Sequence, residues 1–470
     1  MQNHRTVVVI GAGISGLVCA YRLKTLGIDV ALVEKSDRVG GVIQSERING
    51  FLIERGPNSS QGTEELLALV EELGIMSELA EGDPKAPAYV YFDGRLHPVP
   101  SSPGSFIKSH LLSLSGKMRI FREPFVAVRR SDSEESVASF ARRRIGREAA
   151  ERMVAPFVSG IYAGDADRLS VQAAFPKLVN LETGYGGLFR GTFAKAREAR
   201  RAKKAASAVL DKAAPTRRRL CSFHSGMGFL TNTLGSKLGE DLFTGCEGLQ
   251  VERATDSLGF AVGFTRGSNN HAVKCDRIII STPANIASSI TAPFSNELGR
   301  LLGEIEYPPL SIVSLAYDSA SVRTPLDGFG FLVPPSEGLN VLGCVWNSSL
   351  FKGRAPKGKA LVTAFIGGAR NPGGARLADD DLVSTVHNEL QSVLGISSDP
   401  QVVAITRYER SIPQYNLGHF RRVQLIERLQ SDLGGLTLIG NYLHGVSTGD
   451  CIKAADRVAH EVAESLSVTG

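Results

Sequence analysis

Three glycines and one acid near the start of the chain have the types and the spacing of a nucleotide-binding site. Gly11, Gly13 and Gly16 form the pattern G-x-G-x-x-G, and Glu34 follows after a gap of about 20 residues. Such glycines allow a tight turn, let the backbone approach a pyrophosphate and let a helix pack closely on a strand. N–H groups at the helix start would hold the phosphates, and the carboxylate would bind the adenosine ribose. The chemistry indicated is the binding of a dinucleotide.

The elements around these residues support that interpretation. An apolar, mostly β-branched run over 7–10 predicts a buried parallel strand, and apolar residues at helical spacing follow the glycines. A second predicted strand, 29–34, ends at Glu34. A glycine triplet alone is weak evidence, because glycines recur in many loops. Strand, helix, strand and acid in this order are typical of a Rossmann-like unit.

Two further glycine turns are candidates for the same site. Residues 38–41 read Arg-Val-Gly-Gly, and residues 54–58 read Glu-Arg-Gly-Pro-Asn at the end of a predicted strand. Adjacent glycines again permit close backbone approach, although an ordinary turn would use them too. We expect Asn58 or Ser60 to cap the helix that follows.

The order of the segments predicts an α/β protein with a discontinuous nucleotide-binding domain. The predicted segments are 1–84, 221–299 and 411–470 for that domain, 85–220 for an inserted helical domain, and 300–410 for the antiparallel sheet of an α+β substrate domain. A hairpin is expected over 89–97, with Asp93-Gly94 at its turn. Near the end, the strand 436–441 and the loop 445–450 would bring a second set of N–H groups to the cofactor.

The composition is that of an ordinary globular protein. The 470 residues include 43% hydrophobic and 21% charged side chains, enough for two or three domains. Six scattered cysteines show no metal-ligand spacing, which argues for a reducing compartment and against disulfides and structural zinc. No apolar run reaches the roughly 20 residues that cross a bilayer. The first strand begins too early for a signal or transit peptide. We expect a bacterial cytoplasmic protein; a trimmed organelle protein would have the same features.

The net charge of +5 is concentrated in one stretch. Residues 190–219 hold eleven Lys or Arg against two acids, a local charge of +9 that leaves −4 for the rest. A basic helix can contact anionic lipid head groups; a solvated surface helix is the alternative. Nucleic acid is not expected as a partner, because no nucleic-acid-binding motif accompanies the charge.

Taken together, the motifs resemble a known superfamily. The runs GAGISGL, LVEKSDRVGG, ERGPNS and IGNYLHGVSTGDCI are similar to those of FAD-dependent flavoproteins of the amine-oxidase type. Within that superfamily, PFVSGIYAGD, RLSVQAAFPKL, DGFGFLVP, SSLFKGRAPKGK, AFIGGARNP and SIPQYNLGH resemble the protoporphyrinogen oxidase family. The resemblance runs the full length of the chain. It implies FAD as cofactor, a porphyrinogen as substrate and O2 as oxidant.

The resemblance also assigns roles to individual residues. Those implied at FAD are Gly11, Gly13, Gly16, Glu34, Arg38, Gly41, Gly56, Val251 (through its backbone, at the adenine), and Val446, Ser447 and Thr448 (near the isoalloxazine). The tetrapyrrole would lie between Phe365 and Leu332. The remaining residues implied at the substrate are Val345, Phe329 and Phe157, which would line the pocket, and Gly160, whose carbonyl would face the ring nitrogens. Without the resemblance, each apolar residue would be assigned to ordinary core.

The implied reaction is the six-electron oxidation of protoporphyrinogen IX to protoporphyrin IX in haem biosynthesis, with three O2 reduced to three H2O2. A hydride would pass from a methylene bridge to FAD, while the protein supplies position and excludes water. We assign no catalytic side chain and no metal ligand. Peripheral contact at the inner face of the cell membrane would suit a substrate that partitions into lipid. Hand-over to the next haem-pathway enzyme and a homodimer are further expectations.

One departure from the family pattern leaves the substrate open. Many eukaryotic members carry an Arg just before the first hairpin strand, which pairs with a substrate propionate, whereas this chain has Ala88. Lys85, Arg95, His97 or a basic helix residue would have to replace it. Coproporphyrinogen III oxidation, found in the same family, is therefore an alternative. An amine oxidase is less favoured, and the intact glycines and Glu34 argue against a non-catalytic binding protein.

Overall fold

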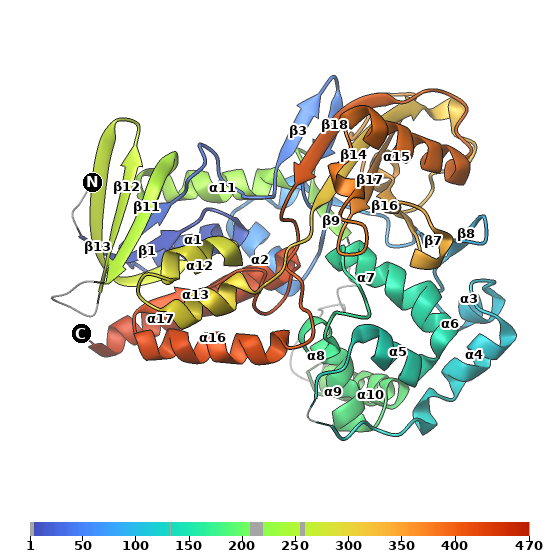
Figure 1. The fold of residues 1–470 in the computed structure, drawn as a ribbon, viewed down its shortest axis with the longest axis horizontal. Helices are drawn as coiled ribbons and strands as arrows, with labels where there is room; N and C mark the ends of the chain where they lie inside the picture. The colour runs from blue at the N-terminus through green and yellow to red at the C-terminus, as the bar shows by residue number, and fades with distance from the viewer. Residues whose placement is uncertain (1–3, 132, 207–219, 254–258, 470) are drawn as a thin grey trace. The chain divides into compact units, whose positions relative to one another are not determined.

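The computed structural model describes residues 4–131, 133–206, 220–253 and 259–469. The chain forms two compact units (Figure 1). The first unit comprises residues 1–82, 220–306 and 421–470, and the second unit comprises residues 83–219 and 307–420. Each unit is built around its own seven-stranded sheet.

The sheet of the first unit has a parallel centre. Strands β2 (Val30–Val33), β1 (His4–Ile10), β13 (Asn269–Ile280) and β19 (Leu436–Leu438) lie in this order and pair in parallel. β10 (Leu242–Phe243) adds to the β2 edge. The strands predicted near residues 7–10, 29–34 and 436–441 are confirmed, and segments from both chain ends meet in one sheet.

Antiparallel strands complete the first unit. β11 (Cys246–Arg253) and β12 (Phe260–Arg266) continue the sheet from the long β13. The smaller elements are the hairpin of β3 (Ser45–Ile48) and β4 (Phe51–Glu54), and a small sheet of β5 (Ser60–Gln61), β9 (Leu220–Phe223) and β6 (Leu79–Glu81).

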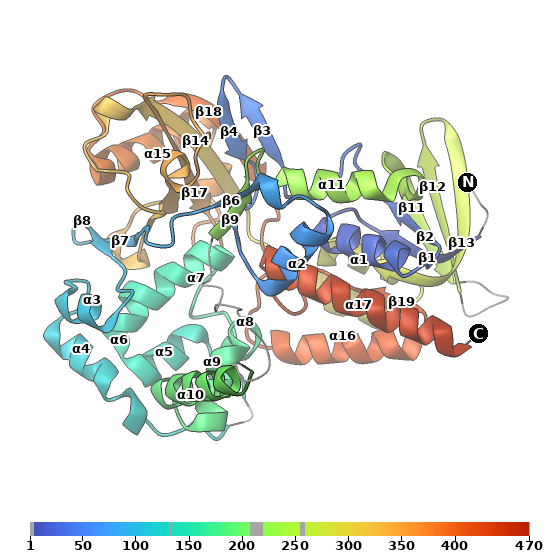
Figure 2. The same ribbon diagram turned by 180° about the vertical axis from the view of Figure 1, so that it is seen from behind.

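Helices cover both faces of the first sheet. On one face lie α1 (Ile14–Thr25), α2 (Glu64–Glu72), α11 (Gly228–Leu238) and α17 (Thr448–Thr469), with their apolar residues in one core with β1 and β2 (Figure 2). On the other lie α12 (Ala284–Thr291) and α13 (Asn296–Gly303) (Figure 1). The prediction that Asn58 or Ser60 caps α2 is wrong. The Thr63 hydroxyl accepts the Leu66 N–H at 3.3 Å, because the chain forms β5 before the helix begins.

The sheet of the second unit is mainly antiparallel. Its order is β18 (Gln401–Tyr408), β14 (Leu310–Asp318), β17 (Lys359–Gly367), β16 (Val341–Val345), β15 (Gly330–Leu332), β7 (Ala88–Phe92) and β8 (Arg95–Pro98). The predicted hairpin is confirmed as β7 and β8, with positive φ at Asp93 and Gly94. β7 pairs in parallel with β15, so the hairpin belongs to this sheet. Helix α15 (Asp379–Leu394) packs on one face.

Further helices form much of the rest of the second unit. In chain order they are α3 (Pro103–Lys108), α4 (Leu114–Phe121), the turn η2 (Glu123–Phe125), α5 (Val137–Ile145), α6 (Arg147–Ala149), the π-turn η3 (Ala150–Val154), α7 (Ala155–Tyr162), α8 (Val171–Ala174), α9 (Pro176–Tyr185), α10 (Leu188–Ala206) and α14 (Asn347–Leu350). Residues 190–206 of the basic stretch are helical in α10, whereas 207–219 lie outside the described residues. Among the described residues, no helix is long and apolar enough to cross a membrane.

A buried ion network ties these helices together. Arg144, with no exposed surface, pairs with Glu123 and lies 3.4 Å from Glu182. Glu123 also accepts the N–H groups of Leu188 at 2.7 Å and Phe189 at 3.1 Å, and so stabilises the start of α10. Moving one of these helices would separate the ion pairs and leave a buried charge unpaired, which is costly. The network therefore fixes α5, α9 and α10 relative to one another.

This network predicts loss of stability in acid. Burial by itself raises the pKa of Glu182, but hydrogen bonds from Arg143 and the Arg129 N–H, with the charges of Arg143 and Arg144, lower it overall. A carboxylate with a lowered folded pKa stabilises the protein above its unfolded pKa, and that stability is lost as the pH falls through the folded pKa. We expect the free energy of unfolding, measured by urea denaturation, to decrease as the pH drops below 4.5, the ordinary pKa of a glutamate side chain.

The variant Glu182→Gln should be less stable at neutral pH and should show a shallower decline in acid. The exposed Glu252→Gln in the first unit is the control and should keep the slope of the parent. An equally steep decline in Glu182→Gln would contradict the assignment.

Candidate cofactor and substrate sites

The first predicted glycine turn lies between β1 and α1, at the carboxyl edge of the parallel strands. Gly11 has φ +99°, and a Cβ there would lie 2.9 Å from the Ser281 carbonyl oxygen. A Cβ on Gly16 would collide with the carbonyl oxygen of Gly11. The close approach of helix and strand therefore depends on both glycines, as the spacing predicts.

The second glycine turn lies beside the first. The Gly40 N–H donates to the Ala12 carbonyl at 2.8 Å, and a Cβ on Gly41 would lie 3.4 Å from the Gly13 Cα. Gly13 is the N-cap of α1, and a Cβ there would meet no atom within 4 Å. The first turn of α1 carries no acid. The two turns thus form a cradle of bare backbone at a helix N-terminus, which fits a pyrophosphate.

Glu34 lies just past the end of β2, next to this cradle. Its carboxylate accepts the Ala12 N–H at 2.7 Å and the Ser36 N–H at 2.9 Å. These bonds fix the carboxylate at the edge of the sheet, and a carboxylate oxygen can accept more than one hydrogen bond. Glu34 can therefore bind a ribose hydroxyl while it orders both turns.

The other residues predicted at the cofactor lie in the same unit. Arg38 is exposed and donates to the Val39 carbonyl at 3.3 Å. A Cβ on Gly56 would collide with the Val42 carbonyl oxygen. Val251 is buried in β11, with its backbone paired to β12.

Two hydroxyls that sequence reasoning missed also belong to this edge. Ser281 and Thr282 follow β13, and their buried side-chain oxygens have no hydrogen-bond partner among the described residues. The Thr282 methyl would lie 3.2 Å from a Cβ on Gly11. Orphaned donors beside the glycine cradle fit a phosphate-bearing cofactor. Their position in the sequence could have indicated this role, because two hydroxyl residues directly follow an apolar strand.

The C-terminal loop leads into α17. The Asp450 N–H donates to the Ser447 hydroxyl at 3.1 Å, and that hydroxyl donates to the Asp450 carboxylate at 2.6 Å. Ser447 therefore caps α17, with Val446 and Thr448 half-buried on either side. Burial raises the pKa of the Cys451 thiol to about 11, which favours the protonated thiol at neutral pH.

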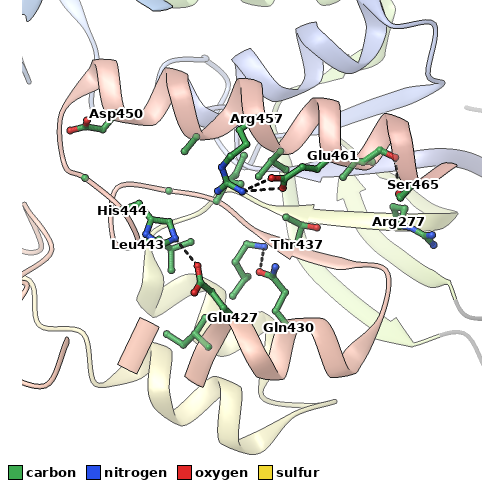
Figure 3. Close-up of a pocket in the computed structure, with 18 of the residues that line it drawn as sticks. Arg277, Glu427, Gln430, Thr437, Leu443, His444, Asp450, Arg457, Glu461 and Ser465 are labelled. Atoms are coloured by element: carbon green, nitrogen blue, oxygen red, sulfur yellow. Dashed lines mark hydrogen bonds and ion pairs between the residues drawn. The ribbon is translucent and has the colours of Figure 1, made fainter. Parts of the chain in front are cut away.

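Behind this loop lies a cavity of about 250 Å³, between α16 (His419–Leu433), β19 and α17 (Figure 3). His444 of the loop pairs with Glu427 of α16 at 2.7 Å, and Gln430 accepts the Leu438 N–H at 2.7 Å. None of the predicted cofactor residues is among those that line the cavity. The first contact braces the loop from the side of α16, and the second joins α16 to β19.

The predicted substrate residues Leu332 and Phe365 lie in one row across the sheet of the second unit. Leu332 is paired with Gly343, and Gly343 with Phe365. The alternate residues of these strands, among them Phe331 and Ile366, pack against α15, so Leu332 and Phe365 stand on the opposite face. They stand two strands apart, about 10 Å, with no side chain on Gly343 between them.

The adjacent row and helix α7 complete this face. Val345 pairs with Gly330 and Thr363, next to Leu332 and Phe365. A Cβ on Gly160 of α7 would lie 2.6 Å from the Leu332 Cδ2. The remaining predicted residues are the half-exposed Phe157 on α7 and the half-buried Phe329 just before β15.

The residues considered as replacements for the missing arginine occupy the hairpin edge. Ala88 pairs with Gly330, and His97 belongs to the row of Val90 and Leu332. The His97 Nε2 lies 3.0 Å from the Phe92 carbonyl oxygen. Lys85 and Arg95 are exposed. Among the described residues, no group of three or more His, Cys, Asp or Glu could hold a metal ion.

Comparisons with known proteins agree with this geometry. The family described as flavin containing amine oxidoreductase matches residues 14–463. "Protoporphyrinogen oxidase 1, chloroplastic" of Arabidopsis thaliana is 35% identical over 98% of this chain and 88% of its own length. "Coproporphyrinogen III oxidase" of Bacillus subtilis is 29% identical over 96% of both chains.

A solved structure from Exiguobacterium sp. 255-15 superposes with a TM-score of 0.79 at 24% identity, covering 98% of this chain and 99% of the other. This likeness concerns the fold alone. The glycine cradle, the acid after β2 and the match over nearly the whole chain give one conclusion: the chain belongs to the family of flavin containing amine oxidoreductases, with FAD as its cofactor.

Proposed function

We propose that this protein oxidises protoporphyrinogen IX to protoporphyrin IX with FAD, using three O2 and releasing three H2O2. The observation that carries the proposal is the row Leu332–Gly343–Phe365. The planar ring of the porphyrin product, in van der Waals contact on both faces, needs walls about 7–8 Å apart, which fits between side chains two strands apart. The first unit would hold FAD as a Rossmann-like domain, and the second unit would hold the tetrapyrrole.

The residues of this chain would act by binding and orientation. The apolar walls Leu332, Phe365 and Val345 would exclude water and fix the plane of the ring. The Gly160 carbonyl, in the last turn of α7, would accept a hydrogen bond from a pyrrole N–H. The backbone N–H groups at the start of α1 would hold the FAD pyrophosphate. When bound, FAD supplies the two-electron acceptor for each oxidation step.

Coproporphyrinogen III is the second candidate substrate. Ala88 at the hairpin edge removes the arginine that many eukaryotic relatives direct at a propionate, and a relative of this activity matches over 96% of the chain. Protoporphyrinogen IX and coproporphyrinogen III should be compared side by side by porphyrin fluorescence, with FAD and O2 present. We expect a higher kcat/KM for protoporphyrinogen IX. A preference for coproporphyrinogen III would assign the chain to the alternative, and oxidation of neither by a yellow protein would contradict both.

An exposed apolar surface suggests how a lipid-soluble substrate reaches the protein. Leu114, Met118 and Phe121 share one face of α4, and Phe125 of η2 follows in line. Leu114 is 78% exposed and Phe125 83% exposed. Other exposed apolar residues of the helical region are Ile107 and Phe193, and its exposed basic residues include Lys108, Arg122, Arg190, Lys195 and Arg197. Apolar residues bordered by cations fit a bilayer surface with anionic lipids, and the helical region would be membrane-facing.

The variant Leu114→Glu/Phe125→Glu should therefore lose binding to anionic vesicles. The parent protein should sediment with the vesicles at low salt. It should be released as salt is raised, because salt screens the attraction between the protein's cations and the anionic lipids. The matched control is Ile286→Glu, which changes an exposed apolar residue of the first unit and should bind like the parent. A parent protein that stays in the supernatant with anionic vesicles at low salt would overturn membrane docking.

A further inference from the structure

Helix α7 ends in an unusual way. After Tyr162 the chain turns at Ala163, a non-glycine residue with φ +46°. The Ala163 N–H still donates to the Ser159 carbonyl at 2.9 Å, but the helix has no further N–H groups for the carbonyls of its last residues and of Ala163. Two of them are satisfied from outside α7: the Tyr162 oxygen accepts the Gln414 side chain at 2.8 Å, and the Ala163 oxygen accepts the Ala369 N–H at 2.8 Å.

Gln414 is built into this helix end. It is 2% exposed, and its Nε2 donates to the carbonyl oxygens of both Tyr162, at 2.8 Å, and Ile412, at 3.0 Å. The Oε1 has no hydrogen-bond partner among the described residues and would lie 2.7 Å from a Cβ on Gly164. The nitrogen of a side-chain amide carries two hydrogens, so Gln414 can donate one to each of the two carbonyls.

The segment that carries Gln414 is itself held firmly. The Ser170 N–H donates to the Tyr415 carbonyl at 2.7 Å, and the Leu417 N–H donates to the Arg168 carbonyl at 2.8 Å. The Tyr415 ring lies 5.6 Å from the Tyr162 ring. Gln414 therefore projects from a fixed backbone onto the end of α7.

What this helix end positions is the substrate face. Gly160 lies two residues before Tyr162, against Leu332, and Phe157 lies one turn earlier on the same exposed side. We propose that Gln414 is a positioning residue for substrate binding, holding the last turn of α7 so that Gly160 stays against Leu332. This role rests on the proposed function, because it assumes that the tetrapyrrole binds at this face.

The test compares substrate binding with stability in Gln414→Met. Methionine keeps the length of the side chain and removes both donors, so the Tyr162 and Ile412 carbonyls lose these hydrogen bonds. We expect KM for protoporphyrinogen IX and the Kd for protoporphyrin IX, measured by fluorescence quenching, to rise about fivefold. The kcat per bound flavin and the FAD content should stay near the parent values.

A second variant, Gly164→Ala, disturbs the Gln414 amide at its oxygen atom instead of its nitrogen. This variant would place a methyl group 2.7 Å from the Gln414 Oε1, 2.8 Å from the Leu169 Cδ1 and 3.1 Å from the Tyr162 Cβ, and should raise KM and Kd in the same way. It also carries the test if Gln414→Met does not fold. The control is Gln430→Met, which removes a side-chain bond to the Leu438 N–H in the first unit and should lower stability without changing KM.

The outcomes separate the two claims. Folded, flavin-loaded Gln414→Met and Gly164→Ala with parental KM and Kd would overturn the positioning role and leave the proposed function intact. A parent protein that binds no protoporphyrin IX would contradict the proposed function, and the role of Gln414 with it.

Discussion

Gly16→Val should purify without bound flavin. A Cβ at this position would collide with the Gly11 carbonyl oxygen, so α1 must move away from β1 and the cradle for the pyrophosphate must open. We expect the free energy of unfolding to fall by about 1–3 kcal/mol, as for overpacking in a tight contact, and FAD to be lost almost completely. The ratio of flavin to protein absorbance after gel filtration measures this.

Gly13→Ala separates cofactor binding from folding. Because a Cβ on Gly13 meets no protein atom within 4 Å, the variant should fold like the parent. Its methyl group would instead occupy the place proposed for the pyrophosphate, so FAD should be weakly held. Gly263→Ala, in β12 of the first unit, where a Cβ would lie 4.0 Å from its nearest atom, the His271 carbonyl oxygen, should keep its flavin. Full flavin occupancy in Gly13→Ala would move the pyrophosphate away from this turn.

The second large effect is expected at Phe365. Phe365→Ala removes one wall of the proposed slot and should lower kcat/KM for protoporphyrinogen IX about 30-fold, which corresponds to about 2 kcal/mol of lost contact. Most of the change should appear in KM, because the side chain binds the ring and takes no part in proton or electron transfer. Steady-state porphyrin fluorescence at varied substrate concentration measures it.

The matched control lies next to it on the same strand. Ile366 points to the opposite face, into the core with α15, so Ile366→Val should cost about 1 kcal/mol of stability and leave KM unchanged. Equal KM values for Phe365→Ala and the parent would show that the substrate does not lie on this face.

The nucleotide-binding half could be predicted from the sequence because its signals are local. Gly11, Gly13 and Gly16 lie within six residues, and Glu34 directly follows the second strand of the same unit. The capping residue was harder, since Asn58, Ser60 and Thr63 are all suitable side chains. Only the short strand β5 decides between them, and two residues leave no periodic pattern.

The substrate half depends on pairing between distant segments. Leu332 and Phe365 were named from the resemblance, and their common row with Gly343 became visible only through strand register, which periodicity does not encode. The hairpin of β7 and β8 was assigned to the helical segment, whereas β7 pairs with β15, about 240 residues away along the chain. Gln414 lies in the run SIPQYNLGH, but its role could not be predicted, because a buried amide looks like any surface glutamine in a sequence.

Anaerobic reduction of the flavin tests the central claim most directly. The purified yellow protein is mixed with protoporphyrinogen IX without oxygen, and flavin absorbance and porphyrin fluorescence are followed together. Our account predicts that the flavin bleaches as it takes two of the six electrons from the tetrapyrrole in a single turnover, and that porphyrin fluorescence rises only after admitted air restores the flavin colour with release of H2O2. A flavin that keeps its absorbance in the presence of excess protoporphyrinogen IX would contradict the account.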